Sequence, residues 1–268
     1  MKKWIVIIFL LSCNAITAQA DSLFKFVKSI KGDIVSFTID NLDYIYLLSS
    51  TNQVKKLNAN SDSVAVFNDV KKFGQVSLID VSNPLKVLLY YRDFATIVVL
   101  DRLLNVRNTI DLRKQNVLQV RAIGQSYDNK IWLYDEVENK LKKIDEDGEL
   151  LLETPDFRQL FGEAPTPQKI FDQDQYVYLY DSAQAVFVFD YYGALKNKIL
   201  ISGWQNFKVA GKYIFGSKDN KLFRYNIQTF RVDEWKMPDE LYLTQSFNFS
   251  SARLYALKKD SIEIYSFR

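Results

Sequence analysis

The sequence has 268 residues, of which 48% are hydrophobic and 25% charged, with one cysteine and no histidine. This composition can form a sizeable core and is unlike that of a disordered chain. Because Cys13 is the only thiol, an internal disulfide is excluded, as are a Ser-His-Asp triad and the histidine- or cysteine-based zinc and haem sites. Its 19 Phe and 16 Tyr, against 9 Gly and 5 Pro, favour β-strands, since aromatic side chains suit a pleated, half-buried surface.

Residues 1–20, MKKWIVIIFLLSCNAITAQA, have the pattern of a secretory signal peptide. Lys2 and Lys3 precede an apolar run at 4–11, and Ala18 and Ala20 suit cleavage after residue 20. The run is too short to span a bilayer, and no later segment reaches the required length. We therefore expect an exported chain without a membrane span, with residues 21–268 as its single domain.

A second reading of the same segment is a lipid anchor. Residues 10–13, Leu-Leu-Ser-Cys, resemble a bacterial lipobox, whose processing would leave a lipidated Cys13. Simple cleavage after Ala20 is the favoured alternative, because the small residues lie at the usual distance past the apolar run.

The charge balance argues against nucleic acid as a partner. Removal of residues 1–20 takes away Lys2 and Lys3 and no acidic residue, so the 35 basic groups fall to 33 against 32 acidic groups. A nearly neutral chain without an arginine cluster lacks the electrostatic surface that binds nucleic acid or an anionic membrane.

A repeated strand pattern organises the mature chain. Six related runs of apolar and aromatic residues begin 36 to 46 residues apart, at 44–48, 86–90, 130–134, 176–180, 212–216 and 253–257. Each is followed after a short polar turn by a second run, at 53–57, 96–100, 140–144, 185–189, 221–225 and 261–265. A period near 40 residues with a constant offset between paired runs indicates a propeller built from hairpins.

The repeat decides an ambiguous stretch, residues 129–148. Val137, Leu141 and Ile144 have helical spacing, but the segment also fits two alternating strands around a polar turn. In the corresponding fourth copy, the run 186–189 is too short, too β-branched and too aromatic for a surface helix. We therefore predict a hairpin at 129–148.

Further apolar segments complete four strands per repeat. One precedes each hairpin, at 34–39, 76–79, 117–123, 169–171, 207–209 and 247–249, and turns ending in Gly148 and Gly193 lead into strands at 149–153 and 195–201. Six four-stranded repeats predict an all-β, six-bladed β-propeller. The last copy ends after its third strand, so we expect the spare strand at 23–30 to supply the outer strand of that blade and close the ring.

Polar residues at the ends of the innermost strands are the candidates for chemistry in the channel. They are Asp40, Asp80, Asp172 and Ser250. The arrangement resembles, in general, the calcium-binding lactonase propellers, which implies a metal held by channel oxygen atoms. Asp at a strand end is first of all a turn residue, so we favour the structural role and expect no catalytic residue, metal or cofactor.

Two departures from the repeat are candidate partner-binding loops. Residues 155–167 carry Phe157, Leu160 and Phe161, which could form one amphipathic turn, and residues 69–74 carry Lys71, Lys72 and Phe73. Insertions in repeat proteins tend to lie on a binding face. For Phe157 and Phe161, capping of the blade beneath is an equal alternative.

No nucleotide-binding or hydrolase motif occurs, and a propeller offers two broad, rigid faces. The signal ending in residues 17–20, the Tyr- and Phe-rich chain and the degenerate blades resemble the small exported propellers of Bacteroidota-type envelopes, including the periplasmic plug subunits of the type nine secretion translocon. The resemblance implies a non-enzymatic periplasmic module that binds a protein partner, an outer-membrane barrel or translocon component, and plugs its pore. A calcium-dependent lactonase or sugar-acting enzyme remains the alternative.

Overall fold

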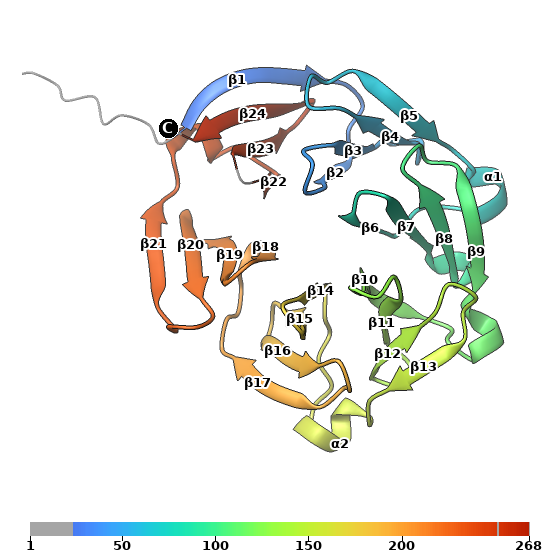
Figure 1. The fold of residues 1–268 in the computed structure, drawn as a ribbon. Coiled ribbons are helices and arrows are strands. Elements are labelled where there is room, and N and C mark those ends of the chain that lie inside the picture. Colours follow the sequence, from blue (N-terminus) through green and yellow to red (C-terminus); the bar gives the residue numbers. More distant parts are fainter. Residues whose placement is uncertain (1–23, 251, 268) are drawn as a thin grey trace, which may run out of the picture.

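Short apolar runs separated by turn residues fold into six four-stranded antiparallel sheets arranged around a central axis (Figure 1). The protein is described by a computed structural model that covers residues 24–250 and 252–267. The predicted signal peptide and Cys13 lie outside the described residues.

The strands follow one another from the inside of each blade to the outside. Blade one comprises β2 (Ser36–Ile39), β3 (Ile45–Leu48), β4 (Val54–Leu57) and β5 (Ser63–Phe67); blade two comprises β6 (Leu78–Asn83), β7 (Lys86–Tyr91), β8 (Thr96–Asp101) and β9 (Val106–Asp111); blade three comprises β10 (Val120–Gln125), β11 (Ile131–Asp135), β12 (Lys140–Ile144) and β13 (Leu150–Glu153). Blade four comprises β14 (Lys169–Gln173), β15 (Tyr176–Asp181), β16 (Ala185–Asp190) and β17 (Leu195–Ile199); blade five comprises β18 (Gln205–Ala210), β19 (Tyr213–Lys218), β20 (Lys221–Asn226) and β21 (Val232–Lys236); blade six contains β22 (Ser246–Phe249), β23 (Arg253–Lys258) and β24 (Ser261–Phe267).

The predicted hairpin at 129–148 is confirmed. β11 and β12 pair from Ile131 opposite Ile144 to Asp135 opposite Lys140. The helical reading was wrong for this segment, because both strands of the hairpin are buried against neighbouring blades.

The predicted ring closure is also confirmed. The N-terminal strand β1 (Phe24–Lys31) pairs antiparallel with β24, with Lys31 opposite Ser261, so the two ends of the described chain share blade six (Figure 1). Phe24 is buried in the core between blades five and six, and this strand covers the otherwise free edge of β24.

The core lies between blades rather than in one centre. Six clusters of buried side chains each join two adjacent blades, and the cluster between blade six and blade one completes the ring. Close approach of the inner strands depends on Gly124, where an added Cβ would lie 2.9 Å from the Ile170 carbonyl oxygen. The packing of each sheet thus depends on both of its neighbours.

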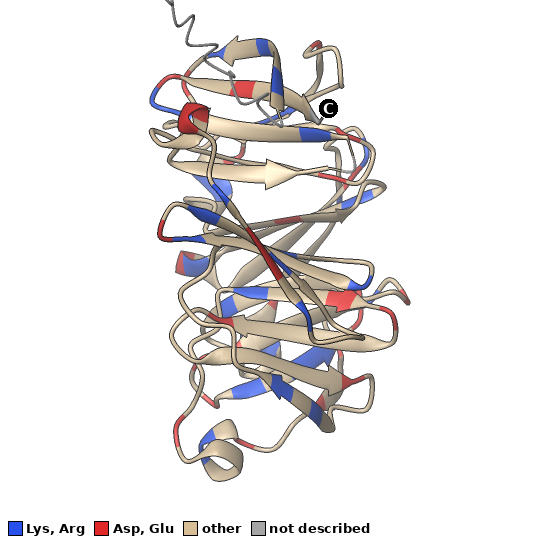
Figure 2. Cartoon of the chain, turned by 90° about the vertical axis from the view of Figure 1, so that its left-hand side faces the viewer, with Lys and Arg blue, Asp and Glu red and all other residues tan. Residues whose placement is uncertain are grey.

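The two faces of the ring differ in their connections. The turn face is where first strands turn into second strands and third strands into fourth, at residues 40–44, 58–62, 83–85, 101–105, 126–130, 145–149, 173–175, 190–194, 211–212 and 226–231. The opposite face, the helix face, carries α1 (Val70–Phe73), α2 (Phe157–Phe161) and the 3-10 segments η1 (Arg92–Phe94), η2 (Leu112–Gln115) and η3 (Asp239–Leu241). Basic and acidic segments are interspersed at both edges of the side view (Figure 2). Among the described residues, no helix is long and apolar enough to span a membrane.

Candidate functional site on the turn face

Asp172, at the end of β14, lies at the centre of a hydrogen-bond network on the turn face. Its carboxylate accepts hydrogen bonds from Ser126 Oγ at 2.9 Å, Tyr127 N at 3.3 Å, Trp132 Nε1 at 3.0 Å and Tyr191 OH at 2.7 Å. Three of these donors belong to blade three and one to blade four. A carboxylate that accepts four hydrogen bonds has little remaining capacity for a metal, and here it joins two blades.

Asp80 has a similar structural role between blades two and three. It accepts hydrogen bonds from Ser82 N at 2.9 Å, Ser82 Oγ at 3.1 Å and Gln125 N at 2.6 Å. Burial raises the pKa of the Asp80 carboxyl, although these hydrogen bonds and nearby Lys169 oppose the shift. The Lys169 side chain is accessible to solvent over part of its length, but its ammonium group lies among the inner strands. Burial of that group lowers the pKa of Lys169, and the nearby Asp80 carboxylate opposes the shift.

Asp40 and Ser250 form turns. Asp40 is buried and accepts hydrogen bonds from Leu42 N, Tyr44 N and Tyr46 OH at 2.9, 3.0 and 3.1 Å. Ser250 Oγ accepts from Arg253 N at 3.1 Å. No three acidic, histidine or cysteine side chains in the described part of the chain are grouped to hold a metal ion. The channel candidates therefore stabilise turns and blade contacts.

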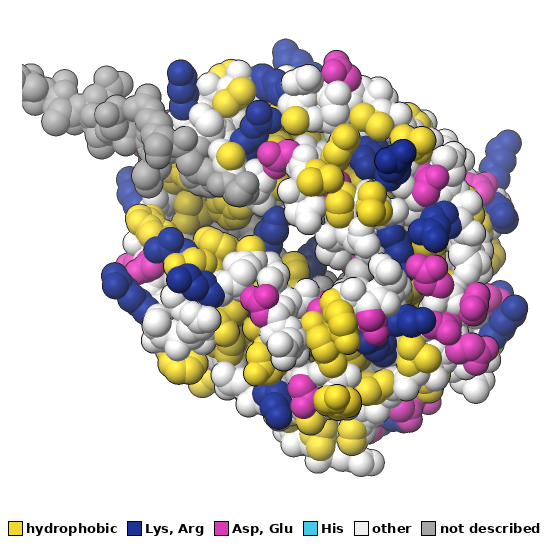
Figure 3. All heavy atoms as spheres, in the orientation of Figure 1, with side chains coloured by type: hydrophobic (Ala, Val, Ile, Leu, Met, Phe, Trp, Pro, Cys, Tyr) yellow, Lys and Arg dark blue, Asp and Glu magenta, His cyan; other side chains and the backbone are white. Residues whose placement is uncertain are grey.

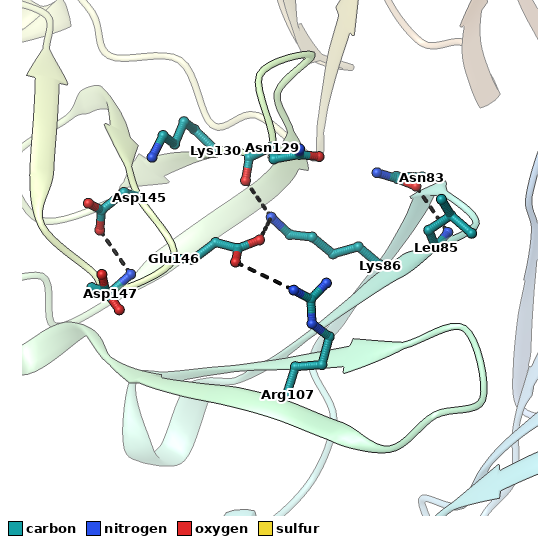
Figure 4. Close-up of a pocket in the computed structure, with 9 residues that line it drawn as sticks. All are labelled: Asn83, Leu85, Lys86, Arg107, Asn129, Lys130, Asp145, Glu146 and Asp147. Atoms are coloured by element: carbon teal, nitrogen blue, oxygen red, sulfur yellow. Dashed lines mark hydrogen bonds and ion pairs between the residues drawn. The ribbon is translucent and has the colours of Figure 1, made fainter.

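A polar pocket of about 500 Å³ opens between blades two and three (Figure 4). Lys86 and Arg107 both point at Glu146: Lys86 Nζ lies 2.8 Å from Oε1, and Arg107 Nη2 lies 4.0 Å from Oε2. Lys86 Nζ also donates to the Asn129 carbonyl oxygen at 2.5 Å. The hydrogen bond from Lys86 lowers the pKa of Glu146, despite partial burial of the carboxyl. The buried Lys86 thereby joins two blades.

A group of aromatic side chains occupies the turn face beside this pocket, between blades three and four. The rings of Tyr127 and Tyr191 stack with centroids 4.3 Å apart and planes 16° apart. Lys143 Nζ lies 5.3 Å from the Tyr127 ring, 5.0 Å from Trp132 and 5.7 Å from Tyr191, and forms a 2.8 Å ion pair with Asp128. Burial and the hydrogen bond to Asp172 raise the pKa of Tyr191. The group is thus fixed by stacking, cation–π contact and hydrogen bonding.

The predicted partner-binding loops both lie on the helix face. Phe157 is fully buried and stacks on Phe189 with centroids 5.2 Å apart, and Phe161 packs against Phe187 at 4.9 Å. Capping of the blade is therefore the structural role of these rings. Of the three predicted residues in this loop, Leu160 is the one whose side chain is exposed.

The second loop is divided in the same way. Phe73 is buried 5.3 Å from the Tyr91 ring, while Lys71 and Lys72 are exposed. The structure does not bring the two loops together, because α1 and α2 lie at different positions around the rim (Figure 1). Partner binding by Leu160, Lys71 and Lys72 stays a prediction.

Sequence reasoning missed the Lys86–Glu146 contact and the stacked tyrosines. Each contact joins two neighbouring blades through residues that are far apart in the chain, Lys86 with Glu146 and Tyr127 with Tyr191. One available signal was that Glu146 and Tyr191 each follow the aspartate that begins an equivalent turn, at Asp145 and Asp190.

No family model matches the chain, and no curated protein matches it by sequence. Solved structures that share its fold include a catalytically inactive virginiamycin B lyase from Staphylococcus aureus with quinupristin, at 13% identity and a TM-score of 0.64, covering 90% of this chain and 99% of that chain. The WD40 domain of Pan2 from Neurospora crassa has 10% identity and a TM-score of 0.62, with 88% and 79% covered. BamB from Moraxella catarrhalis has 12% identity and a TM-score of 0.54, with 92% and 98% covered.

These likenesses, at such low identity, show the fold alone. The chain is a six-bladed β-propeller, related in structure to lyase, WD40 and BamB propellers.

Proposed function

We propose that the protein is a non-catalytic β-propeller of the periplasm that serves as a protein-binding module of an outer-membrane complex. The observation that carries this proposal is the structural use of the channel acids. Asp40, Asp80 and Asp172 all accept hydrogen bonds that hold turns or blades together. The broad faces are then the surfaces best suited to function.

Exposed apolar side chains on those faces support protein binding. Around a central opening, hydrophobic side chains alternate with charged ones (Figure 3). Such mixed surfaces with exposed aromatic residues are typical of protein interfaces. The export signal predicted at residues 1–20 supports the periplasmic location.

The finer proposal is that the protein plugs the periplasmic side of a type nine secretion translocon. Its support is the resemblance in layout to the exported propellers of such envelopes. A rigid disc with a closed ring of blades is physically suited to covering a pore, because it needs no folding on binding.

The test is affinity purification of C-terminally tagged protein from its native host after mild detergent extraction. Stoichiometric recovery of a large outer-membrane barrel is the expected result. Recovery of the propeller alone, at an extraction where known barrel complexes stay intact, would contradict the proposal.

A calcium-dependent lactonase or sugar-acting enzyme is the second candidate. The observation in its favour is the enclosed Asp80, whose carboxyl pKa is raised by burial and which lies near Lys169 in the channel. Perturbed ionisable groups gather at catalytic sites, although structural networks produce them too.

A further inference from the structure

Two cationic side chains meet where the ring closes, between blade six and blade one. Lys28 Nζ, from β1, donates a hydrogen bond to the Ala59 carbonyl oxygen at 3.0 Å. Arg253 Nη1, from the start of β23, donates to the same oxygen at 3.3 Å. The two side chains come from opposite ends of the described chain, and one atom of blade one holds them close together. We call Lys28, Arg253 and the Ala59 carbonyl group the seam site.

The strands direct both side chains towards blade one. Ile30, two residues after Lys28 in β1, packs against the core between blades six and one, and Tyr255, two residues after Arg253 in β23, belongs to the same core. Because alternate residues of a strand share a face, Lys28 and Arg253 also face blade one. The Arg253 backbone N–H donates to Ser250 Oγ at 3.1 Å, which fixes the start of β23. The fold itself therefore brings the two cations together.

The seam site holds two positive charges without an ion pair. In the described part of the chain, Lys28 and Arg253 share a neutral carbonyl oxygen and neither pairs with a carboxylate. Burial and the charge of Arg253 lower the pKa of Lys28, while Asp62 opposes the shift. The Asp62 carboxylate accepts a hydrogen bond from Asn58 Nδ2 at 3.0 Å instead. Two like charges this close repel each other, so an anion placed between them is favoured.

A second acid, Asp43, lies further towards the channel. It is near the buried Tyr255 hydroxyl, whose pKa burial and Asp43 raise and Arg253 lowers. Asp43 also lies near Lys208 of blade five, because it opposes the lowering of the Lys208 pKa by burial. A cation from another blade therefore accompanies this acid, and Lys28 and Arg253 remain in excess over Asp62.

Most N–H groups of the seam site are unused. A guanidinium group has five N–H donors and an ammonium group has three, and the hydrogen bonds to Ala59 use one of each. Both side chains are partly exposed, so a solute can reach them. A guanidinium fork binds two oxygens of a phosphate group, and an ammonium group binds a third as a point charge. A phosphate has enough oxygens to engage both cations at once.

We propose that the seam site binds a phosphate group, with the Arg253 guanidinium and the Lys28 ammonium on different oxygens. Bound phosphate links two strands of blade six to each other beside blade one, so it stabilises the closed ring. This inference goes beyond the proposed protein-binding function and does not depend on it. The phosphate is either a soluble ligand or part of a lipid headgroup, and the test separates these two sources.

The test is isothermal titration calorimetry of the full-length mature protein with inorganic phosphate, at pH 7 and constant ionic strength. We expect one site per chain and a higher melting temperature in phosphate than in sodium chloride of equal ionic strength. Arg253→Gln and Lys28→Gln should each weaken Kd about fivefold or more. Lys25→Gln, an exposed change in the same strand as Lys28, should leave Kd unchanged.

Conservative variants keep the test valid if a glutamine variant does not fold, which its melting curve checks. Lys28→Arg keeps the charge and should retain phosphate binding. Arg253→Lys keeps the charge but loses the guanidinium fork, so it should bind more weakly than wild type and more tightly than Arg253→Gln. Equal binding by wild type, Arg253→Lys and Arg253→Gln would contradict the assignment.

Vesicles of phosphatidylcholine with and without phosphatidic acid separate the two sources of phosphate. Co-sedimentation that needs phosphatidic acid and is lost in the folded glutamine variants assigns the site to a lipid headgroup, whereas binding of free phosphate alone assigns it to a soluble ligand. No heat of binding, or equal weakening by Lys25→Gln, would overturn the inference. Co-purification with an outer-membrane barrel tests the proposed function separately, since it does not require the seam site.

Discussion

Lys142 and Asp135 form an ion pair that is sealed from solvent, with Nζ 2.8 Å from Oδ2 and side-chain exposures of 3% and 0%. They lie on neighbouring strands of blade three, and Asp135 also accepts the backbone N–H groups of Val137 and Glu138. Burial would lower the pKa of Lys142, but hydrogen bonds to Asp135 and Glu138 outweigh it and raise the pKa. Each charge therefore depends on the other.

Removing one partner of this pair should be strongly destabilising. Lys142→Met leaves the Asp135 carboxylate buried without its cation, and we expect a loss of about 3–5 kcal/mol in the free energy of unfolding. Lys140→Met, on the same strand, breaks only partly exposed pairs with Glu138 and Glu153 and should cost less than about 1 kcal/mol. Urea denaturation of both variants provides the comparison, and equal losses would contradict the prediction.

The contact between Lys86 and Glu146 should make stability depend on acidity. Because the folded-state pKa of Glu146 is lowered from its ordinary 4.5, the contribution of this pair is present above that pH and is lost as the pH falls through the lowered pKa. Wild type should therefore exceed Glu146→Gln in stability at pH 7, and the difference should shrink steadily as the pH is lowered below 4.5. Glu149→Gln, an exposed change in the same turn, should show no such difference, and a gap that persists at low pH would refute this explanation.

The inner strand β10 approaches β14 so closely at Gly124 that a methyl group would contact the Ile170 backbone. Gly124→Ala should shift one blade against the next and cost about 1–3 kcal/mol, as overpacking of a core does. At Gly32 an added Cβ meets nothing nearer than Ile34 Cγ1 at 3.9 Å, so Gly32→Ala should change the melting temperature little. Similar melting of the two variants would show that the strands can separate without cost.

Much of the fold followed from the spacing of apolar runs. The second and third strands of every blade start within one residue of their predicted positions, since the spacing of these paired runs repeats from blade to blade and their apolar side chains pack between neighbouring blades. The first strands were less accurate. In blade three the apolar Val117 suggested a strand from 117, but Val117 follows η2 and donates its N–H to the Leu112 carbonyl, so β10 begins at Val120.

The candidate site was less predictable. The sequence identified Asp40, Asp80 and Asp172 as strand-end residues, and their turn and inter-blade roles agree with the favoured structural reading. It gave no means to foresee that Tyr127 would stack on Tyr191, because that contact depends on how one blade is rotated against the next. The sequence could not show that Phe157 would be buried and Leu160 exposed, because both are apolar residues of one short helical turn.

Calcium offers a test of the channel. If Asp172 serves only as a hydrogen-bond acceptor, millimolar CaCl₂ should not raise the melting temperature of the wild-type protein. Asp172→Asn should lower the melting temperature, since the loss of charge weakens the hydrogen bonds from Trp132 and Tyr191. The melting temperature of this variant should likewise be unchanged by calcium. A calcium-dependent rise that Asp172→Asn or Asp80→Asn abolishes would favour the enzymatic alternative.

The strand that closes the ring should be essential for the stability of blade six. Deleting residues 21–31 removes β1, exposes the edge of β24 and takes Phe24 out of the core between blades five and six. Loss of a buried phenylalanine alone costs about 3–5 kcal/mol, so we expect the melting temperature to fall by about 10 °C or more. Val27→Ser, an exposed change within the same strand, should have little effect. A synthetic peptide of residues 21–31 added to the shortened protein should restore part of the loss by pairing with β24, whereas unchanged melting after the deletion would show that the ring closes without this strand.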